Sequence, residues 1–240
     1  MVKPIVVKAE DFDASKLTFC DPEPVNTGGR VNMSKIPILY DGCLLVLQTP
    51  VFKRCSVRGF DRKSDTDKVA LIFYQSVKYA DEEFYAKDVI GTISQAVKAH
   101  IKSNVRSLFQ RKKDSVADLT FYDPVSEQAD SIKTTVPTVS REDMTPAKEV
   151  RFYMEGKGEI SNDAAEKLFQ ENNRTVSGRA LVSVPYAYII NKQAYGLKNM
   201  LCSFDIRKKP EDKEIMSDGG SGSSARVDGS GLLDMGDAFC

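Results

Sequence analysis

The segment from Lys35 to Phe60 constrains the fold most strongly, because it holds the longest run of apolar residues typical of β-strands. Apolar residues dominate 36–40 and 43–47, and Asp41-Gly42 separates the two runs. Short runs rich in Ile, Leu and Val that meet at a glycine-containing turn predict two paired strands. We therefore expect a β-hairpin near the centre of the fold.

A strand of different character follows this hairpin. Strict alternation would place Phe52, Arg54, Ser56, Arg58 and Phe60 on one face, with small apolar residues on the other. Arginine neutralises phosphate and an aromatic ring can stack on a base, so this face suits a single-stranded nucleic acid. A solvated sheet face whose phenylalanines fold onto an edge is the alternative interpretation.

The rest of the chain predicts a mainly β fold with α structure. Strands are expected over 3–8, 17–19, 68–76, 119–122, 132–136 and 150–154, and a closing hairpin over 180–191 and 194–208. Apolar residues at intervals of three and four from Val89 to Leu108 predict one long packing helix that begins near Asp81. A short helix through about Glu171 is expected to have Asn162 or Asp163 as its N-cap.

The closing hairpin carries a second candidate surface. Parity places Tyr186, Tyr188, Ile190 and Lys192 on one face of its first arm. Two tyrosines two residues apart could stack on consecutive bases, although paired tyrosines are also typical of half-buried packing between strands.

Composition excludes several classes of function. The only histidine of the 240 residues is His100, the five cysteines show no CxxC spacing, and no Walker, HExxH or GxSxG pattern occurs. We expect no catalytic residues, no metal and no cofactor, and thus a protein that is not an enzyme. No apolar run approaches the roughly 20 residues of a membrane span, so we also expect an intracellular protein without membrane contact.

Charge divides the chain into two predicted parts. Residues 210–240 hold two basic and seven acidic side chains, a net charge of −5, which leaves +5 on residues 1–209 because the whole chain is neutral. The composition of the last 31 residues predicts a flexible acidic tail with an apolar tip. The expected organisation is a folded domain over 1–209 and a tail over 210–240. An ordinary solubilising tail is the alternative.

These features together resemble a known family. KIPILYDGCLLVLQTPVF, a later basic strand, one long helix and the hairpin YIINKQAYGLKNMLCSFDIRK are similar to the OB-fold single-stranded DNA-binding proteins of large eukaryotic (nucleocytoplasmic) DNA viruses. The acidic tail, which ends near a phenylalanine, resembles those of phage and bacterial single-stranded DNA-binding proteins. The resemblance covers roughly 35–210 for the body and 211–240 for the tail.

The resemblance implies an OB-like β-barrel of about five strands with insertions. It implies sequence-independent binding of single-stranded DNA in viral replication, recombination or repair, in the host cytoplasm or nucleus. The basic and aromatic residues expected to contact nucleic acid are Phe52, Lys53, Arg54, Arg58, Phe60, Arg62, Lys63, Lys112, Lys113, Tyr186, Tyr188, Lys192, Tyr195 and Lys198.

The tail is expected to recruit replication proteins and to compete with DNA for the groove, through its tip residues Leu232, Leu233, Asp234, Met235, Asp237 and Phe239. The sequence does not distinguish a monomer from a homo-oligomer. The alternative function is a non-enzymatic structural or interaction protein of a virion or viral assembly.

Overall fold

The computed structural model describes residues 2–26, 32–58, 71–109, 118–138, 149–172 and 175–207. Five strands close into a barrel: β6 (Phe52–Arg58), β7 (Ile72–Ser76), β9 (Ser131–Thr135), β13 (Ala194–Arg207) and β12 (Val176–Ile190). The first three form an antiparallel meander, β9 meets β13 in parallel, and β12 pairs antiparallel with both β13 and β6. This is a five-stranded Greek-key barrel of the OB type, which confirms the predicted fold class.

Additional strands extend the sheet beyond the barrel. β4 (Met33–Tyr40) and β5 (Cys43–Gln48) pair with β12, and they form the hairpin expected from the sequence. β1 (Pro4–Lys8) lies parallel to β5, while β2 (Leu17–Phe19) and β3 (Glu23–Val25) pair with β4. On the other side, β8 (Thr120–Tyr122) and β10 (Arg151–Met154) pair with β13, and β11 (Gly158–Ile160) pairs with β10.

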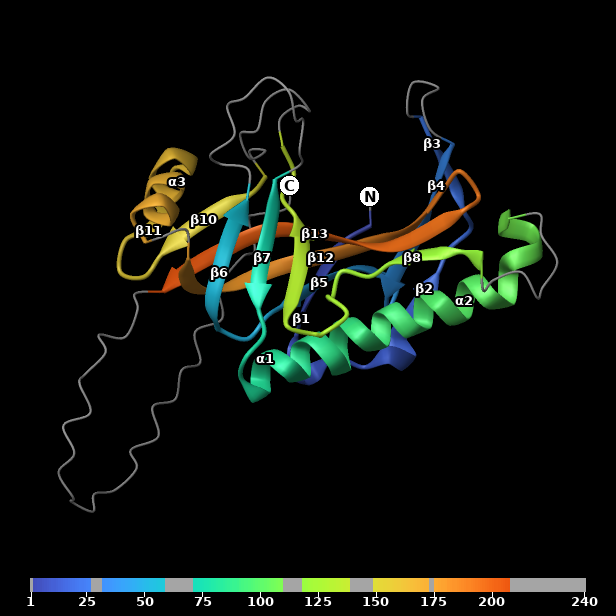
Figure 1. Ribbon diagram of the computed structural model, residues 1–240, viewed down its shortest axis with the longest axis horizontal. Coiled ribbons are helices and arrows are strands. Elements are labelled where there is room, and N and C mark those ends of the chain that lie inside the picture. The colour runs from blue at the N-terminus through green and yellow to red at the C-terminus, as the bar shows by residue number, and fades with distance from the viewer. Residues whose placement is uncertain are drawn as a thin grey trace, which may run out of the picture. The chain divides into compact units, whose positions relative to one another are not determined.

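The hairpin of β12 and β13 runs through the whole sheet, as Figure 1 shows. Its arms are 15 and 14 residues long. Asn191 and Lys192 in the connecting turn both have positive φ, 51° and 55°, and the Gln193 N–H donates to the Ile190 carbonyl. Turn residues with positive φ match the twist of antiparallel strands. Both arms reach far beyond the barrel, so they carry the extra strands as well as the barrel wall.

The predicted long helix is present but not uniform. It consists of α1 (Ala80–Phe84), a π-helical turn over Tyr85–Ile90, and α2 (Gly91–Phe109). The stripe continues through α2 at intervals of four residues, because Ile93, Val97, Ile101, Val105 and Phe109 are all buried. α2 lies along the sheet (Figure 1), where the Phe109 ring meets the Tyr195 ring edge-on.

A short helix covers the far end of the barrel. α3 (Asn162–Glu171) begins after Ser161, whose Oγ accepts a hydrogen bond from the Ala164 N–H. The N-cap is thus Ser161, and the prediction of Asn162 or Asp163 in this role is wrong. Phe169 of α3 packs on Phe204, which in turn contacts Phe73 inside the barrel. None of the helices in the described ranges is both long and apolar enough to cross a membrane.

Candidate nucleic-acid interface

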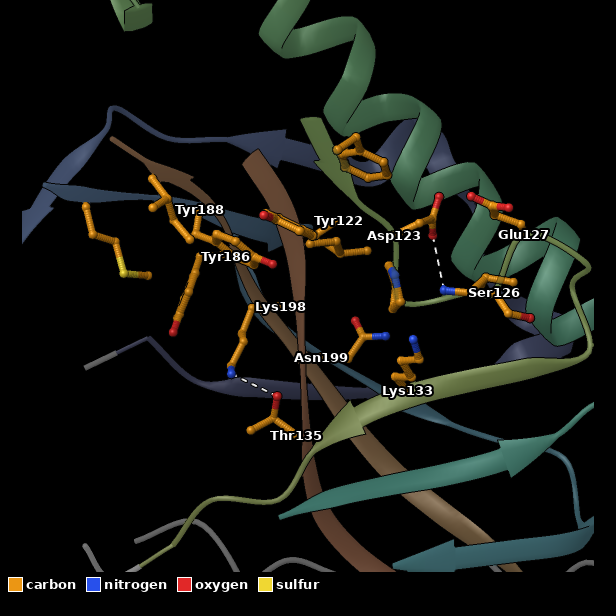
Figure 2. A pocket seen from close by; sticks show the side chains of 16 residues that line it. Tyr122, Asp123, Ser126, Glu127, Lys133, Thr135, Tyr186, Tyr188, Lys198 and Asn199 are labelled. Atoms are coloured by element: carbon orange, nitrogen blue, oxygen red, sulfur yellow. Dashed lines mark hydrogen bonds between the residues drawn. The ribbon is translucent and has the colours of Figure 1, made fainter. Parts of the chain in front are cut away.

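A cleft of about 590 Å³ opens beside the β12–β13 hairpin, where β8, β9 and the loop between them approach β13 (Figure 2). One wall comes from the far half of β12 and the paired residues of β13. The opposite wall comes from Tyr122 and the residues that follow β8, and the base from β9. The volume lies in the range of small-ligand sites.

Two tyrosines form the β12 wall. Tyr186 and Tyr188 both line the cleft, and both are half-buried. Tyr186 pairs across the strands with Lys198, and Tyr188 pairs with Gly196, so the two rings and the lysine share one face of the sheet. Burial raises the pKa of both phenols. They are therefore neutral hydrogen-bonding rings at physiological pH.

Two lysines supply positive charge. The Lys198 Nζ donates to the Thr135 Oγ1 at 2.8 Å, and desolvation lowers the pKa of this ammonium. Lys133 lies two residues before Thr135 on β9 and is exposed. A third lysine, Lys35 of β4, lies beside Tyr186 and makes an ion pair of 3.0 Å with Glu23.

Acidic groups balance part of this charge. Asp123 accepts hydrogen bonds from the Ser94 hydroxyl at 3.1 Å and from the Val125 N–H at 3.2 Å, and its other oxygen lies 3.6 Å from the Lys98 Nζ. Asp123 is thus neutralised by α2 and positions the loop after β8. Glu127 also lines the cleft and is exposed. The cleft is therefore modestly basic, with Lys133 and Lys198 as the cations that face its interior.

The predicted alternation of β6 fails at Phe52, because β6 contains a bulge. From Arg54 onward it holds, since Arg54 is exposed while Cys55 and Val57 are buried. Cys55 pairs with Val176 and Phe52 with Gly178, so three steps along β6 match two steps along β12. An extra residue in one strand of a pair interrupts the alternation of faces. As a result Phe52 and Cys55 both point into the core, and the fully buried Phe52 ring lies edge-on to Tyr85. The prediction of Phe52 as a stacking ring is wrong.

Lys53 and Arg54 are both exposed as a consequence of the same bulge. They lie far from the tyrosines, because β6 pairs with β12 near Gly178, eight residues from Tyr186. Eight residues of a strand span roughly 26 Å. The structure therefore does not bring the β6 cations and the tyrosine wall into one cleft.

Tyr195 is also wrong as a stacking residue. It is 5% exposed, and its ring packs against Phe121 and Phe109. Lys192 lies in the hairpin turn beyond the end of β12 and is half-buried. It does not line the cleft.

The remaining predicted residues lie outside the described part of the chain. They are Phe60, Arg62, Lys63, Lys112, Lys113 and the tail residues Leu232, Leu233, Asp234, Met235, Asp237 and Phe239. Only the backbone of Arg58 is described, as the end of β6. Their expected contacts stay predictions.

The structure adds three residues that the sequence did not single out: Tyr122, Lys133 and Asn199. Tyr122 and Lys133 lie at the two ends of a stretch without regular periodicity, so the sequence pattern does not indicate that they meet in one cleft. Asn199 carried a usable signal, because an amide within the apolar run of β13 implies a buried polar group with a specific role.

Comparisons with known proteins do not assign the chain to a family. A scan against protein-family models finds no match, and a search of curated proteins finds no relative. Within the described residues there is also no group of three or more His, Cys, Asp and Glu side chains that could hold a metal ion.

Proposed function

We propose that the protein binds single-stranded DNA without strong sequence preference, along the wall formed by Tyr186 and Tyr188. The observation that carries this proposal is the placement of two half-buried tyrosines and Lys198 on one face of a cleft. The replication, recombination or repair context comes from the resemblance described above, as does recruitment of replication proteins by the tail.

The spacing of the tyrosines suits unstacked bases. Residues two apart on a strand are separated by about 6.6 Å, which leaves room for one base on each ring. Stacking on an aromatic side chain contributes about 1–3 kcal/mol per base and tolerates any base. A duplex cannot use this wall, because its bases already stack on one another.

The charge of the cleft sets the expected salt dependence. Each phosphate neutralised on a single strand contributes about −0.7 to the slope of log K against log salt. Lys133 and Lys198 together therefore predict a slope of about −1.4 from the described cleft. Stacking, which salt affects little, is expected to provide the larger share of the affinity.

The test is a fluorescence-anisotropy titration of a labelled oligo-dT of about 30 nucleotides at several salt concentrations. A duplex and an oligo-U of the same length serve as competitors. Lys133→Ala should weaken binding and reduce the salt slope by about 0.7. The matched control is Lys157→Ala, because Lys157 is an exposed lysine outside the cleft.

Each result has a defined meaning. Salt-sensitive binding that favours the single strand and is weakened by Lys133→Ala supports the proposal. An equal effect of Lys133→Ala and Lys157→Ala would show that the DNA lies elsewhere. Absence of binding to every oligonucleotide by the full chain would favour the structural or interaction function instead.

A further inference from the structure

The cleft contains a break in the sheet. β8 ends its pairing with β13 at Tyr122 and Gly196, and β9 meets β13 at Thr135 and Met200. Between these points, within the described residues, β13 has no strand partner on the side of the cleft. We call this stretch of one-sided pairing, Leu197, Lys198 and Asn199, the sheet gap. A strand edge of this kind presents unpaired backbone donors and acceptors.

The side chain of Asn199 lies in the sheet gap and has unused hydrogen-bonding capacity. The residue is 3% exposed, and neither its Nδ2 nor its Oδ1 has a partner among the described residues. Leaving one such buried group unpaired costs about 1–3 kcal/mol. The residue nonetheless lines the cleft, and Figure 2 shows its amide between Lys198 and Lys133. A ligand that pairs with this amide would therefore satisfy both groups.

We propose that the sheet gap receives one unstacked adenine of the bound strand and that Asn199 recognises its edge. The Oδ1 would accept from the 6-amino group, and the Nδ2 would donate to the neighbouring ring nitrogen. Asparagine makes this two-bond pairing with adenine more readily than with other bases. The inference rests on the proposed function, because the bound strand delivers the base.

The surroundings of the sheet gap suit a nucleotide. Tyr188 and Tyr122 lie together at its Gly196 end and offer flat surfaces to a base. Lys133 is exposed and lies next to the Asn199 amide in Figure 2, so its flexible side chain can move aside and bind the phosphate of the same nucleotide. The tyrosine wall would thus accept any base, while the sheet gap would favour adenine at one position.

The experiment is a double-mutant cycle between the protein and the DNA. The protein variants are wild type and Asn199→Leu, which keeps the side-chain size and removes both polar atoms. The DNA ligands are short oligomers that carry adenine or purine at every position, where purine lacks the 6-amino group. For each oligomer, the affinity of the wild type is divided by that of Asn199→Leu, which cancels the stacking of the bases within the free oligomer. Thermal unfolding checks that Asn199→Leu remains folded, and Asn199→Ser is used if it does not.

The ratio of adenine-oligomer affinity to purine-oligomer affinity should be roughly three- to ten-fold higher for the wild type than for Asn199→Leu, which is the effect of one hydrogen bond. Binding in which both proteins show the same ratio would overturn the role of Asn199 and leave the proposed function intact. If the wild type binds neither these oligomers nor oligo-dT, the proposed function and this inference both fail.

Discussion

The ring of Tyr188 lies directly over Gly196, its partner on the neighbouring strand. A Cβ placed on Gly196 would lie 2.5 Å from the Tyr188 hydroxyl oxygen and 2.8 Å from the Tyr122 carbonyl oxygen. Glycine at this position therefore lets the ring lie flat against the sheet, and it fixes the orientation of the tyrosine wall.

Replacing Gly196 with alanine should displace the Tyr188 ring. We expect Gly196→Ala to lower the free energy of unfolding by about 1–3 kcal/mol, as overpacking does, and to weaken binding of oligo-dT. Chemical denaturation and anisotropy measure the two effects. Gly91→Ala is the control, since its nearest contact is 3.4 Å and alanine favours a helix. A Gly196→Ala protein as stable as the wild type would contradict this packing.

The buried carboxylate of Glu82 joins α1 to the barrel. It is 1% exposed and accepts hydrogen bonds from the backbone N–H groups of Lys53, Lys78 and Tyr79, at 2.9, 2.7 and 3.1 Å. Glu82→Gln replaces one acceptor oxygen with a donor and faces it toward these N–H groups. The expected loss of stability is about 2–3 kcal/mol, measured by urea unfolding.

Glu83 provides the matched control for that substitution. It is exposed, and its carboxylate makes an ion pair of 3.6 Å with Lys87 one turn further along the helix. Glu83→Gln should change the stability by less than about 0.5 kcal/mol. Equal losses for the two variants would mean that the Glu82 carboxylate does not hold α1 in place.

The charge of Lys198 should make DNA binding depend on pH. Desolvation lowers the pKa of this ammonium, so it loses its proton at a lower pH than an ordinary lysine. Only the protonated form attracts phosphate, and affinity should therefore fall as the pH rises toward 10. The advantage of the wild type over Lys198→Met should shrink over the same range. Lys157→Met should match the wild type at every pH, and a constant advantage over Lys198→Met would refute the assignment.

The single histidine should make the stability of the fold decrease as the pH falls. The ring of His100 stacks on Phe19 at 4.5 Å, and burial lowers its pKa below 6.5. The folded state thus prefers neutral His100, so its contribution is present above pH 6.5 and is lost as the pH falls through the folded pKa. The melting temperature should drop between pH 7 and pH 5, and less so in His100→Gln. An equal drop in both proteins would assign the effect to other groups.

Removing the acidic tail tests the proposed competition with DNA. Residues 211–240 carry the −5 charge, and their deletion should tighten binding of oligo-dT, most strongly at low salt where charge repulsion acts furthest. A variant that keeps the tail but replaces its aspartates with asparagines separates charge from length. Unchanged affinity after deletion would rule out competition and leave partner recruitment as the role of the tail.

Much of the fold could be predicted because its elements have clear periods. A local pattern of apolar residues specifies the strand before Asp41-Gly42 and the helix that contains Ile93 and Val97. The same holds for the hairpin around Asn191. The closure of β9 onto β13 could not be predicted in the same way. It joins Thr135 to Met200, which lie 65 residues apart, and no local pattern encodes such a pairing.

The candidate site was only partly predictable for a similar reason. Tyr186, Tyr188 and Lys198 obey simple alternation, which places them on one face. Phe52 does not obey alternation, because one extra residue in β6 turns its side chain into the core. The sequence of β6 shows no pattern that predicts this bulge. Lys133 and Asn199 enter the site through long-range pairing, and this information is absent from any local pattern.

The central position of the β12–β13 hairpin also determines when the protein can fold relative to its synthesis. β4, β5, β6 and β10 each pair with β12 or β13 along one edge, yet these two strands are the last of the described elements to leave the ribosome. Until about residue 207 is available, the earlier strands have unpaired edges of the kind that promote aggregation. The barrel is therefore expected to fold after synthesis of the hairpin, and slowly, since its key contacts join distant segments.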